Sequence, residues 1–195
     1  YEFDHWSGDL SGSANPTPIT MNSDKNVIAH FKSHGSIQPV ADSPQQAGTA
    51  FPVDIQVENV TNLFGVAFVF HYTHTDYINV VPLFVKGDFL GSDVIFLEPV
   101  IDDAAGTVSI GITRKRPDPG VSGSGVVAKV TLKSSATTPD GTPVDFTLTD
   151  IVANDPDGGA IPLTPQPLPV IIKQPVGPDI AVTPPSWDYG NVKVG

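Results

Sequence analysis

Acidic and amide side chains are densest in one short segment, Asn154-Asp155-Pro156-Asp157-Gly158-Gly159, which follows Asp150. Carboxylate and amide oxygens at this density are typical of calcium-binding loops. The spacing is not that of an EF-hand, however, and no glutamate closes the loop. Asp-Gly is also common in tight turns, where the aspartate bonds to nearby backbone N–H groups. The segment therefore predicts a turn rather than a metal site, and leaves Asp155 and Asp157 as the candidate ligands.

Other residues that could support catalysis or bind a metal are scattered. His71 and His74 could share a metal ion if the chain turned between them, but no third ligand lies nearby, so surface histidines are the favoured interpretation. The chain has no cysteine, which excludes disulfides, thiolate zinc sites and a cysteine nucleophile. No serine lies in a G-x-S-x-G motif, and Glu58 and Glu98 have no evident partner carboxylate. We therefore predict no enzyme activity and no cofactor.

The balance of charge limits the possible partners. Lys and Arg number 10 against 21 Asp and Glu, a net charge of -11, which disfavours nucleic acid and anionic membranes as partners. No apolar run approaches the length of about 18 residues that a membrane span needs, so we predict no membrane insertion. Three basic residues, Arg114-Lys115-Arg116, lie together. They could pair with carboxylates of a partner or form a solvated hairpin end.

The elements that must position these residues are strands. Apolar residues recur with period two between Gly, Pro, Asp and Asn clusters, and no stretch keeps helical spacing over three turns. This pattern predicts an all-β, antiparallel β-sandwich of about nine strands. The expected strands include 50–58, 64–72, 76–81, 94–101, 106–113, 125–133, 144–152 and 160–172.

Three of these strands combine an apolar face with an outer face of small, weakly polar residues. In residues 65–72 the inward residues are Val66, Phe68, Phe70 and Tyr72, and the outward residues are Gly65, Ala67, Val69 and His71. Residues 106–113 and 125–133 repeat the pattern. An outer surface with few charges and small side chains is what a flat protein interface needs.

Residues 37–173 resemble a cohesin domain, the module that binds dockerin domains in cellulosomes and related surface assemblies. The resemblance depends on Phe51–Val57, Leu63–Tyr72, Lys86–Leu90 and Ser124–Lys133. It implies a jelly-roll sandwich, a dockerin-bearing partner, calcium bound by the dockerin, and a monomer in isolation. The parent protein would be an extracellular or cell-surface scaffold, as in scaffoldins of polysaccharide catabolism.

The resemblance also implies which residues bind the partner. The binding sheet would consist of strands 64–72, 94–101, 106–113 and 125–133. An apolar centre around Val69, Leu97 and Ile101 would be surrounded by polar groups, as interfaces require. The outward residues would be Gly65, Ala67, Val69, His71, Leu97, Pro99, Ile101, Thr107, Ser109, Gly111, Thr113, Val127, Lys129 and Thr131. The alternatives are that this face packs against a neighbouring domain, or that it is apolar without binding anything.

The two ends resemble pieces of other surface modules. Residues 1–31 resemble the second half of an InlB-like bacterial surface repeat, and residues 179–195 resemble the first strand of an Ig-like module. Residues 32–36 and the Pro-rich 174–178 are expected to be linkers. The expected organisation is thus a cohesin-like sandwich between two partial modules, excised from a longer exported protein.

Two other functions fit the same fold class. A carbohydrate-binding module would need a flat row of exposed aromatic rings, whereas Trp6 and Trp187 lie in the flanks and Tyr77 alone cannot form one. A structural spacer of a surface adhesin would suit the flanking modules, and the sequence does not separate it from a docking module.

Overall fold

The structure is a computed structural model that describes residues 2–32 and 34–177. Every regular element of the described residues is a β-strand. None of them forms a helix long and apolar enough to cross a membrane. The predicted all-β class is confirmed. The expected Ig-like fragment, 179–195, lies outside the described residues.

The first two strands form a sheet of their own. β1 (Glu2–Gly8) pairs antiparallel with β2 (Val27–Lys32). Aromatic rings gather on one of its faces, where the ring centroid of Phe3 lies 4.8 Å from that of Trp6 and 6.1 Å from that of Phe31. Phe31 remains 61% exposed. No residue of this hairpin belongs to the buried core of the described chain, which runs from Ile37 to Ile172.

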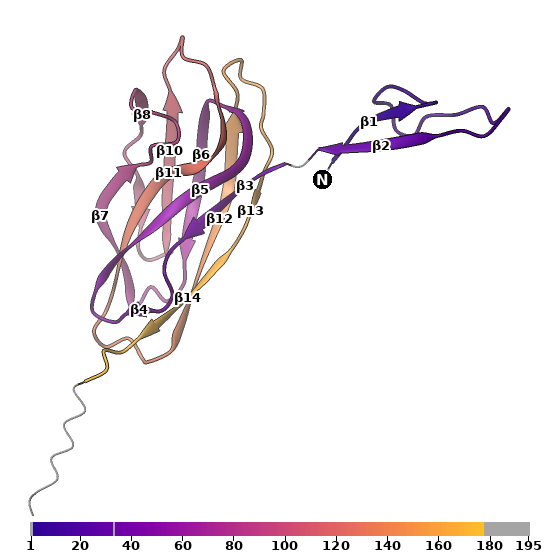
Figure 1. The fold of residues 1–195 in the computed structure, drawn as a ribbon. Coiled ribbons are helices and arrows are strands. Elements are labelled where there is room, and N and C mark those ends of the chain that lie inside the picture. The colour runs from indigo at the N-terminus through magenta and orange to yellow at the C-terminus, as the bar shows by residue number, and fades with distance from the viewer. Residues whose placement is uncertain (1, 33, 178–195) are drawn as a thin grey trace, which may run out of the picture.

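The remaining twelve strands form two sheets packed face to face (Figure 1). The five-stranded sheet has the order β13 (Leu163–Pro165), β3 (Gly35–Val40), β5 (Ala50–Leu63), β11 (Val121–Ser134) and β7 (Ile78–Lys86). The seven-stranded sheet has the order β4 (Gln45–Gln46), β14 (Leu168–Lys173), β12 (Thr142–Asn154), β6 (Gly65–Tyr72), β10 (Thr107–Arg114) and β8 (Val94–Phe96), with β9 (Val100–Asp102) also paired to β10. Pairing is antiparallel except for β13 with β3 and β14 with β4.

Several strand boundaries differ from those predicted. β3 begins at Gly35, inside the segment expected to be a linker, and its Ile37 is fully buried in the core. The expected strand 94–101 is two short strands, and 160–172 is also divided in two. These divisions, together with the two-residue β4, raise the number of strands in the sandwich above the expected nine.

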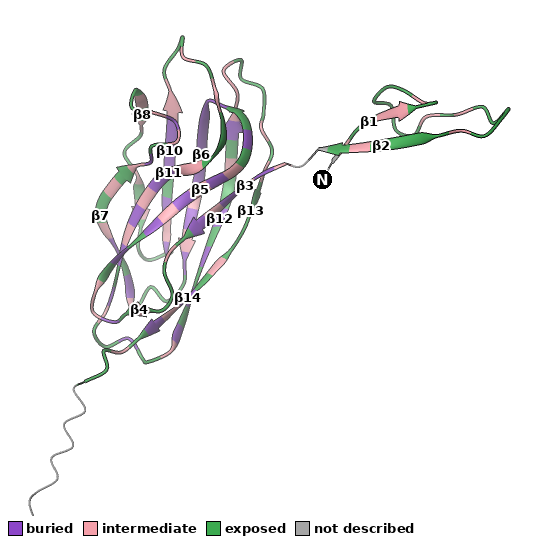
Figure 2. Ribbon diagram, in the orientation of Figure 1, coloured by how far each residue is buried: buried purple, intermediate pink, exposed green. Residues whose placement is uncertain are grey.

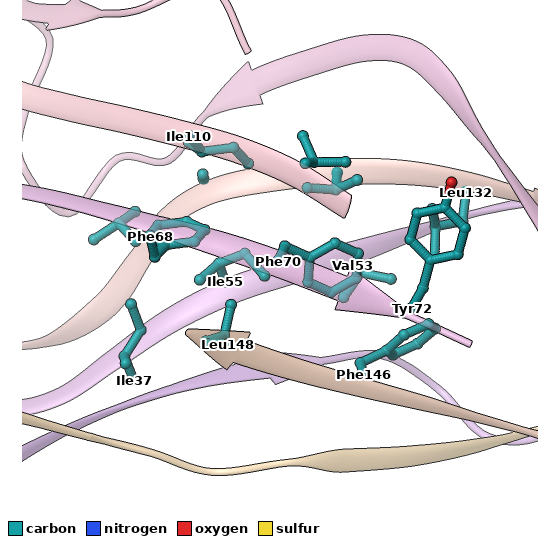
Figure 3. Close-up of a cluster of buried hydrophobic side chains, with 14 of the residues drawn as sticks. Ile37, Val53, Ile55, Phe68, Phe70, Tyr72, Ile110, Leu132, Phe146 and Leu148 are labelled. Carbon is teal, nitrogen blue, oxygen red and sulfur yellow. The ribbon is translucent and has the colours of Figure 1, made fainter. Parts of the chain in front are cut away.

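The core between the sheets follows from the alternation of inward and outward side chains along the strands. Burial alternates along the long strands (Figure 2), so that each strand gives one side chain in two to the interior. Phe68 and Phe70 of β6 and Phe146 of β12 are among the largest fully buried side chains. The rings of Phe70 and Phe146 lie 5.5 Å apart. Figure 3 shows Ile55 and Val53 of β5 beside Phe68 and Phe70 of β6, so both sheets contribute to one continuous core.

One partly buried polar contact connects the two sheets at an end of the sandwich. The Tyr72 hydroxyl at the end of β6 donates a 2.8 Å hydrogen bond to Asp103 Oδ1, in the turn after β9. The same oxygen accepts a 3.3 Å hydrogen bond from the backbone N–H of Val80 in β7. Burial, and then the Asp103 carboxylate, raise the pKa of Tyr72 above its usual range.

Candidate partner-binding face

The outer face of the seven-stranded sheet consists of small side chains in regular rows. The register sets Thr113, Gly65 and Asn154 side by side on β10, β6 and β12. The next rows along the strands are Gly111, Ala67 and Val152, then Ser109, Val69 and Thr149, then Thr107, His71 and Thr147. We call this surface the seven-stranded face.

The predicted residues of β6 and β10 do point to this face. Ala67 and Ser109 are exposed, and Val69, His71, Thr107 and Thr113 are half-buried. Gly65 and Gly111 are buried beneath neighbouring side chains: a Cβ on Gly65 would lie 2.8 Å from Thr113 Oγ1, and one on Gly111 would lie 3.0 Å from Leu97 Cδ1. The face is therefore low at its centre, where only small residues lie.

Apolar side chains project around this low centre. Leu97, in the connection after β8, is 58% exposed, Val100 of β9 is 68% exposed and Val152 of β12 is 66% exposed. Leu97 lies over Gly111, and its backbone N–H donates a 2.9 Å hydrogen bond to the Gly111 carbonyl. These three aliphatic side chains are each more than half exposed and lie on one sheet face. An apolar group of this kind is typical of the centre of a protein interface.

Among the described residues, two open hollows lie on this face, one on each side of Leu97. The first, which we call the Thr113 hollow, is bordered by Gly65, Ala67, Leu97, Gly111, Thr113, Val152 and Asn154. The second, the Ser109 hollow, is bordered by Ala67, Val69, Leu97, Glu98, Val100, Ser109, Gly111 and Asp150. Ala67, Gly111 and Leu97 belong to both, so the two hollows are consecutive along the strands.

Matching β-bulges lie on both sides of the Ser109 hollow. The three residues of β10 from Gly111 to Ser109 lie opposite four residues, Leu97 to Val100. The three residues of β6 from Ala67 to Val69 likewise lie opposite four residues of β12, Thr149 to Val152. Each longer stretch has one extra residue, and a bulge of this kind redirects the side chains around it. Glu98 lies in the first bulge and Asp150, with a φ of 49°, in the second.

Because of the first bulge, the side chains of strand 94–101 do not keep the predicted alternation. Leu97 points outward as expected, but after the extra residue the alternation reverses. Ile101 therefore packs against the core, and Val100 takes the outward position opposite Ser109. Pro99 is half-buried in the bulge. The expectation that Ile101 lies at the apolar centre is wrong, and Val100 takes its place.

Strand 125–133 is in the other sheet. β11 pairs with β5 and β7, so Val127, Lys129 and Thr131 do not lie on the seven-stranded face. Val127 is fully buried, because a bulge between Val126 and Ala128 turns both Val127 and Ala128 inward. Lys129 Nζ lies 2.7 Å from Asp54 Oδ2 on the outer surface of the five-stranded sheet. Alternation predicts which residues share a face of a strand, but not which sheet the strand joins.

β12 is the strand that sequence reasoning left out of the face. The sequence predicts a strand at 144–152, and the alternation of apolar and small polar residues along it resembles that of β6 and β10. Val144, Phe146 and Leu148 are buried, while the outward Thr147 and Thr149 are small and polar like those of β10. His71 Nε2 lies 2.7 Å from Thr149 Oγ1, which connects β6 and β12 across the face.

The described residues hold no group of three His, Cys, Asp or Glu side chains that could hold a metal ion. Asp155 Oδ1 accepts hydrogen bonds from the backbone N–H groups of Asp157, at 2.9 Å, and Gly159, at 2.7 Å. The 154–159 segment is therefore folded as a tight turn capped by its own aspartate.

The basic cluster is bonded within the molecule. Arg114 Nη2 donates a 3.0 Å hydrogen bond to Asp118, and Arg114 Nη1 donates to the Leu90 carbonyl. Lys115 pairs with Asp93 and Arg116 donates to the Pro156 carbonyl. These contacts fix the loop after β10. The expectation of a hairpin end is wrong, because the loop leads from β10 to β11 in the other sheet.

Comparison with solved structures identifies the fold as that of cohesin modules. A non-cellulosomal cohesin from Archaeoglobus fulgidus matches with a TM-score of 0.56 and 18% identity, covering 72% of this chain and 91% of that one. A type II cohesin from the cellulosome of Acetivibrio cellulolyticus matches with a TM-score of 0.58 and 18% identity, covering 71% and 95%. A type I cohesin–dockerin complex from Clostridium thermocellum matches with a TM-score of 0.60 and 14% identity, covering 76% and 99%. The predicted cohesin-like sandwich is confirmed.

A family model for a divergent InlB B-repeat domain matches residues 1–50. This is consistent with the predicted surface-repeat fragment, although the match extends beyond residue 31 into β3 and β4. A search of curated proteins finds no match.

Proposed function

We propose that the chain is a non-catalytic recognition module whose seven-stranded face binds a dockerin domain. The observation that supports this most strongly is the combination, on one flat sheet face, of exposed Leu97, Val100 and Val152 around a low centre of Gly111 and Ala67. When a partner covers such exposed aliphatic side chains, the complex is stabilised by about 25 cal/mol per Å² of apolar surface removed from water. The affinity would then come from burial of the face and not from a cofactor.

The outer face of the other sheet contrasts with this one. Two pairs of polar side chains are bonded there: Lys129 with Asp54, and Gln38 Nε2 with Glu58 Oε1 at 2.8 Å. Polar groups that already have hydrogen-bond or ion-pair partners within the chain contribute little additional binding free energy when a second protein covers them. The comparison supports the seven-stranded face as the docking surface. Structures with this fold include cohesins in complex with dockerins.

We further propose that the parent protein is extracellular or attached to a cell surface, where cohesins assemble dockerin-bearing proteins on a scaffold. The match of residues 1–50 to a divergent InlB B-repeat supports a modular protein of this kind. The sandwich would act as a monomer, with calcium bound by the dockerin.

A carbohydrate-binding module is the main alternative. It differs from a docking module because it requires exposed aromatic rings. In the described sandwich, Phe68, Phe70 and Tyr72 are buried, and Phe84, Phe89 and Phe96 are packed against the core. Stacking on sugars needs accessible ring faces. We expect no saturable retention of the chain on insoluble polysaccharide, and saturable retention would favour the carbohydrate module.

The direct test is calorimetric titration with a panel of isolated dockerin modules of both type I and type II. We expect at least one to bind in calcium-containing buffer, and we expect that binding to disappear when EDTA removes calcium from the dockerin. If no dockerin in the panel binds, the docking proposal gives way to the spacer of a surface adhesin.

A further inference from the structure

The turn after β12 contains an aspartyl-prolyl peptide bond whose carbonyl group is held by two donors. The carbonyl oxygen of Asp155 accepts a 2.7 Å hydrogen bond from Asn154 Nδ2 and a 3.1 Å hydrogen bond from the backbone N–H of Gly158. The residue that follows Asp155 is Pro156, and both are half-buried. Two donors at these distances form an oxyanion hole, because they stabilise the negative charge that a carbonyl oxygen gains when a nucleophile attacks its carbon.

The nucleophile that could attack this carbonyl is the side chain of the same residue. Asp155 Oδ1 accepts hydrogen bonds from the backbone N–H groups of Asp157 and Gly159, which fix the carboxylate and leave Oδ2 for the attack. A Cβ on Gly159 would lie 2.7 Å from Oδ2, so glycine leaves the space that the carboxylate occupies. Attack of Oδ2 on the carbonyl carbon closes a five-membered ring, and a nucleophile held within the same residue reacts far faster than one from solution.

Pro156 supplies the leaving group. Its nitrogen belongs to a tertiary amide, which takes up a proton more readily than an ordinary peptide nitrogen. Asp155 Oδ2 forms a bond to the carbonyl carbon, the bond from that carbon to the Pro156 nitrogen breaks, and the nitrogen takes a proton from water. A second water then opens the cyclic anhydride, so that Asp155 ends one piece with two carboxylates and Pro156 begins the other with an amine.

The chain has a second aspartyl-prolyl bond, between Asp118 and Pro119, which lacks this arrangement. The Asp118 carboxylate is paired with Arg114 Nη2 at 3.0 Å, and the Asp118 carbonyl has no hydrogen-bond donor among the described residues. A carboxylate paired with a guanidinium is a weaker nucleophile, and a carbonyl without donors is not stabilised when it is attacked. The fold therefore distinguishes two bonds of the same chemical type.

The strands that follow the turn would hold the C-terminal piece in place after cleavage. β14 pairs with β12 from Leu168 to Ile172, and Val170 and Ile172 are fully buried. β13 also pairs with β3, and β14 with β4. Cleavage in the turn between β12 and β13 would thus remove a covalent connection and leave the sandwich assembled.

We propose that the bond between Asp155 and Pro156 is a self-cleavage site, at which the folded chain cuts its own backbone once and keeps both pieces. Each molecule reacts a single time, so the step involves no turnover. Mild acid promotes it, because a protonated proline nitrogen cannot attack the anhydride again. The charged groups at the turn are Asp155 and Asp157, together with Arg116, which donates to the Pro156 carbonyl from the loop after β10.

The first test is incubation of the full chain at pH 5 and 37 °C, followed by mass spectrometry under denaturing conditions. We expect two fragments, one ending at Asp155 and one beginning at Pro156, whose masses together equal that of the chain plus one water. In the folded chain this bond should break at least about tenfold faster than the bond between Asp118 and Pro119, because only its carbonyl has donors. In concentrated guanidinium chloride that advantage should disappear.

Three results of this test would overturn the inference. They are equal cleavage of the two bonds in the folded chain, an unchanged preference in the unfolded chain, and a chain that stays intact for a week.

Variants separate the contributions of the leaving group and of the carbonyl donors. Pro156→Ala should abolish cleavage, because an ordinary peptide nitrogen is a poorer leaving group, whereas the matched control Pro119→Ala should leave the rate unchanged. Asn154→Asp keeps the size of the side chain but replaces the N–H donor with an acceptor, and should slow cleavage about tenfold. Urea unfolding establishes that each variant is folded. Undiminished cleavage in Pro156→Ala or in folded Asn154→Asp would contradict the mechanism.

The second test measures whether the pieces stay together. The cleaved chain should elute as a single species at the volume of the intact chain in size-exclusion chromatography without denaturant, and separate into two bands in denaturing electrophoresis. Separate elution of the two pieces without denaturant would show that β13 and β14 do not retain the C-terminal piece.

Discussion

At the scale of single residues, the low centre of the seven-stranded face depends on having almost no side chain at Gly111. A Cβ there would approach Leu97 Cδ1 to 3.0 Å, so a larger residue must push the Leu97 side chain aside and fill the hollows. The backbone of Gly111 does not need the left-handed region that favours glycine. The requirement for glycine here therefore comes from space on the surface.

Gly111→Val tests this interpretation. Valine is well suited to a strand, and the displaced Leu97 side chain can move into solvent, so the free energy of unfolding should change by less than about 1 kcal/mol. Dockerin binding should weaken by about 2 kcal/mol, because the face loses its complementary shape. Calorimetry and urea unfolding measure the two quantities. Substantial unfolding of the variant would mean that Gly111 serves the core and not the surface.

Tyr72 gives a prediction for alkaline pH. Its pKa is raised by burial and by Asp103, so the folded state favours the neutral hydroxyl. Unfolded tyrosine has a pKa of about 10. The stabilisation from neutral Tyr72 is therefore fully present below about pH 10 and is lost as the pH rises further.

In urea unfolding, the wild type should lose more stability between pH 9 and 11 than Tyr72→Phe, which cannot ionise there. At neutral pH, Tyr72→Phe should cost about 1 kcal/mol, because the hydrogen bond to Asp103 is removed. Equal losses of stability in the two proteins at high pH would contradict this explanation.

At the scale of elements, the sequence predicts well which side chains of a strand point inward, but predicts poorly which strands pair with one another. The inward residues of β6 and β10 were all correctly predicted, since Phe68, Phe70 and Ile110 leave no other face to bury. The reversal at Ile101 was not predictable from periodicity, because one extra residue at Glu98-Pro99 changes the parity of everything after it. Which sheet holds β11 depends on long-range pairing with β5 and β7, which no local pattern encodes. The rows of β6 and β10 could thus be predicted, whereas β12 could be predicted as a strand but not assigned to this sheet, because its pairing with β6 is long-range.

The turn between β12 and β13 is the segment for which we predict that calcium does not bind. Asp155 Oδ1 accepts two backbone hydrogen bonds, so its oxygen is committed to the turn. Calorimetric titration of the isolated chain with calcium should give no heat at micromolar affinity. An isotherm with one site that disappears in Asp157→Ala would show instead that the turn is a calcium loop.

At the scale of the whole molecule, the sandwich holds the entire buried core of the described residues. The core runs from Ile37 to Ile172, and the hairpin of β1 and β2 leaves Phe31 61% exposed. The match of residues 1–50 to an InlB B-repeat model crosses from this hairpin into β3, so sequence similarity and packing divide the chain differently. Packing determines which part can fold alone.

A fragment of residues 33–176 should therefore unfold cooperatively, with a melting temperature within a few degrees of that of the full chain. Thermal unfolding followed by circular dichroism compares the two. A melting temperature lower by more than about 8 °C would show that the segments outside the fragment stabilise the sandwich.

The central claim, that the seven-stranded face is the docking surface, is tested most directly by two leucines of equal exposure. Leu97 is 58% exposed on this face, and Leu83 of β7, in the opposite sheet, is 59% exposed. Leu97→Glu should weaken a dockerin that binds the wild-type chain by about 30-fold or more, because a charge would be buried in the complex without a partner. Leu83→Glu should leave that affinity unchanged, and both variants should keep the free energy of unfolding within about 1 kcal/mol of wild type. Equal effects of the two substitutions on binding, or unfolding of the domain by Leu97→Glu, would contradict the claim.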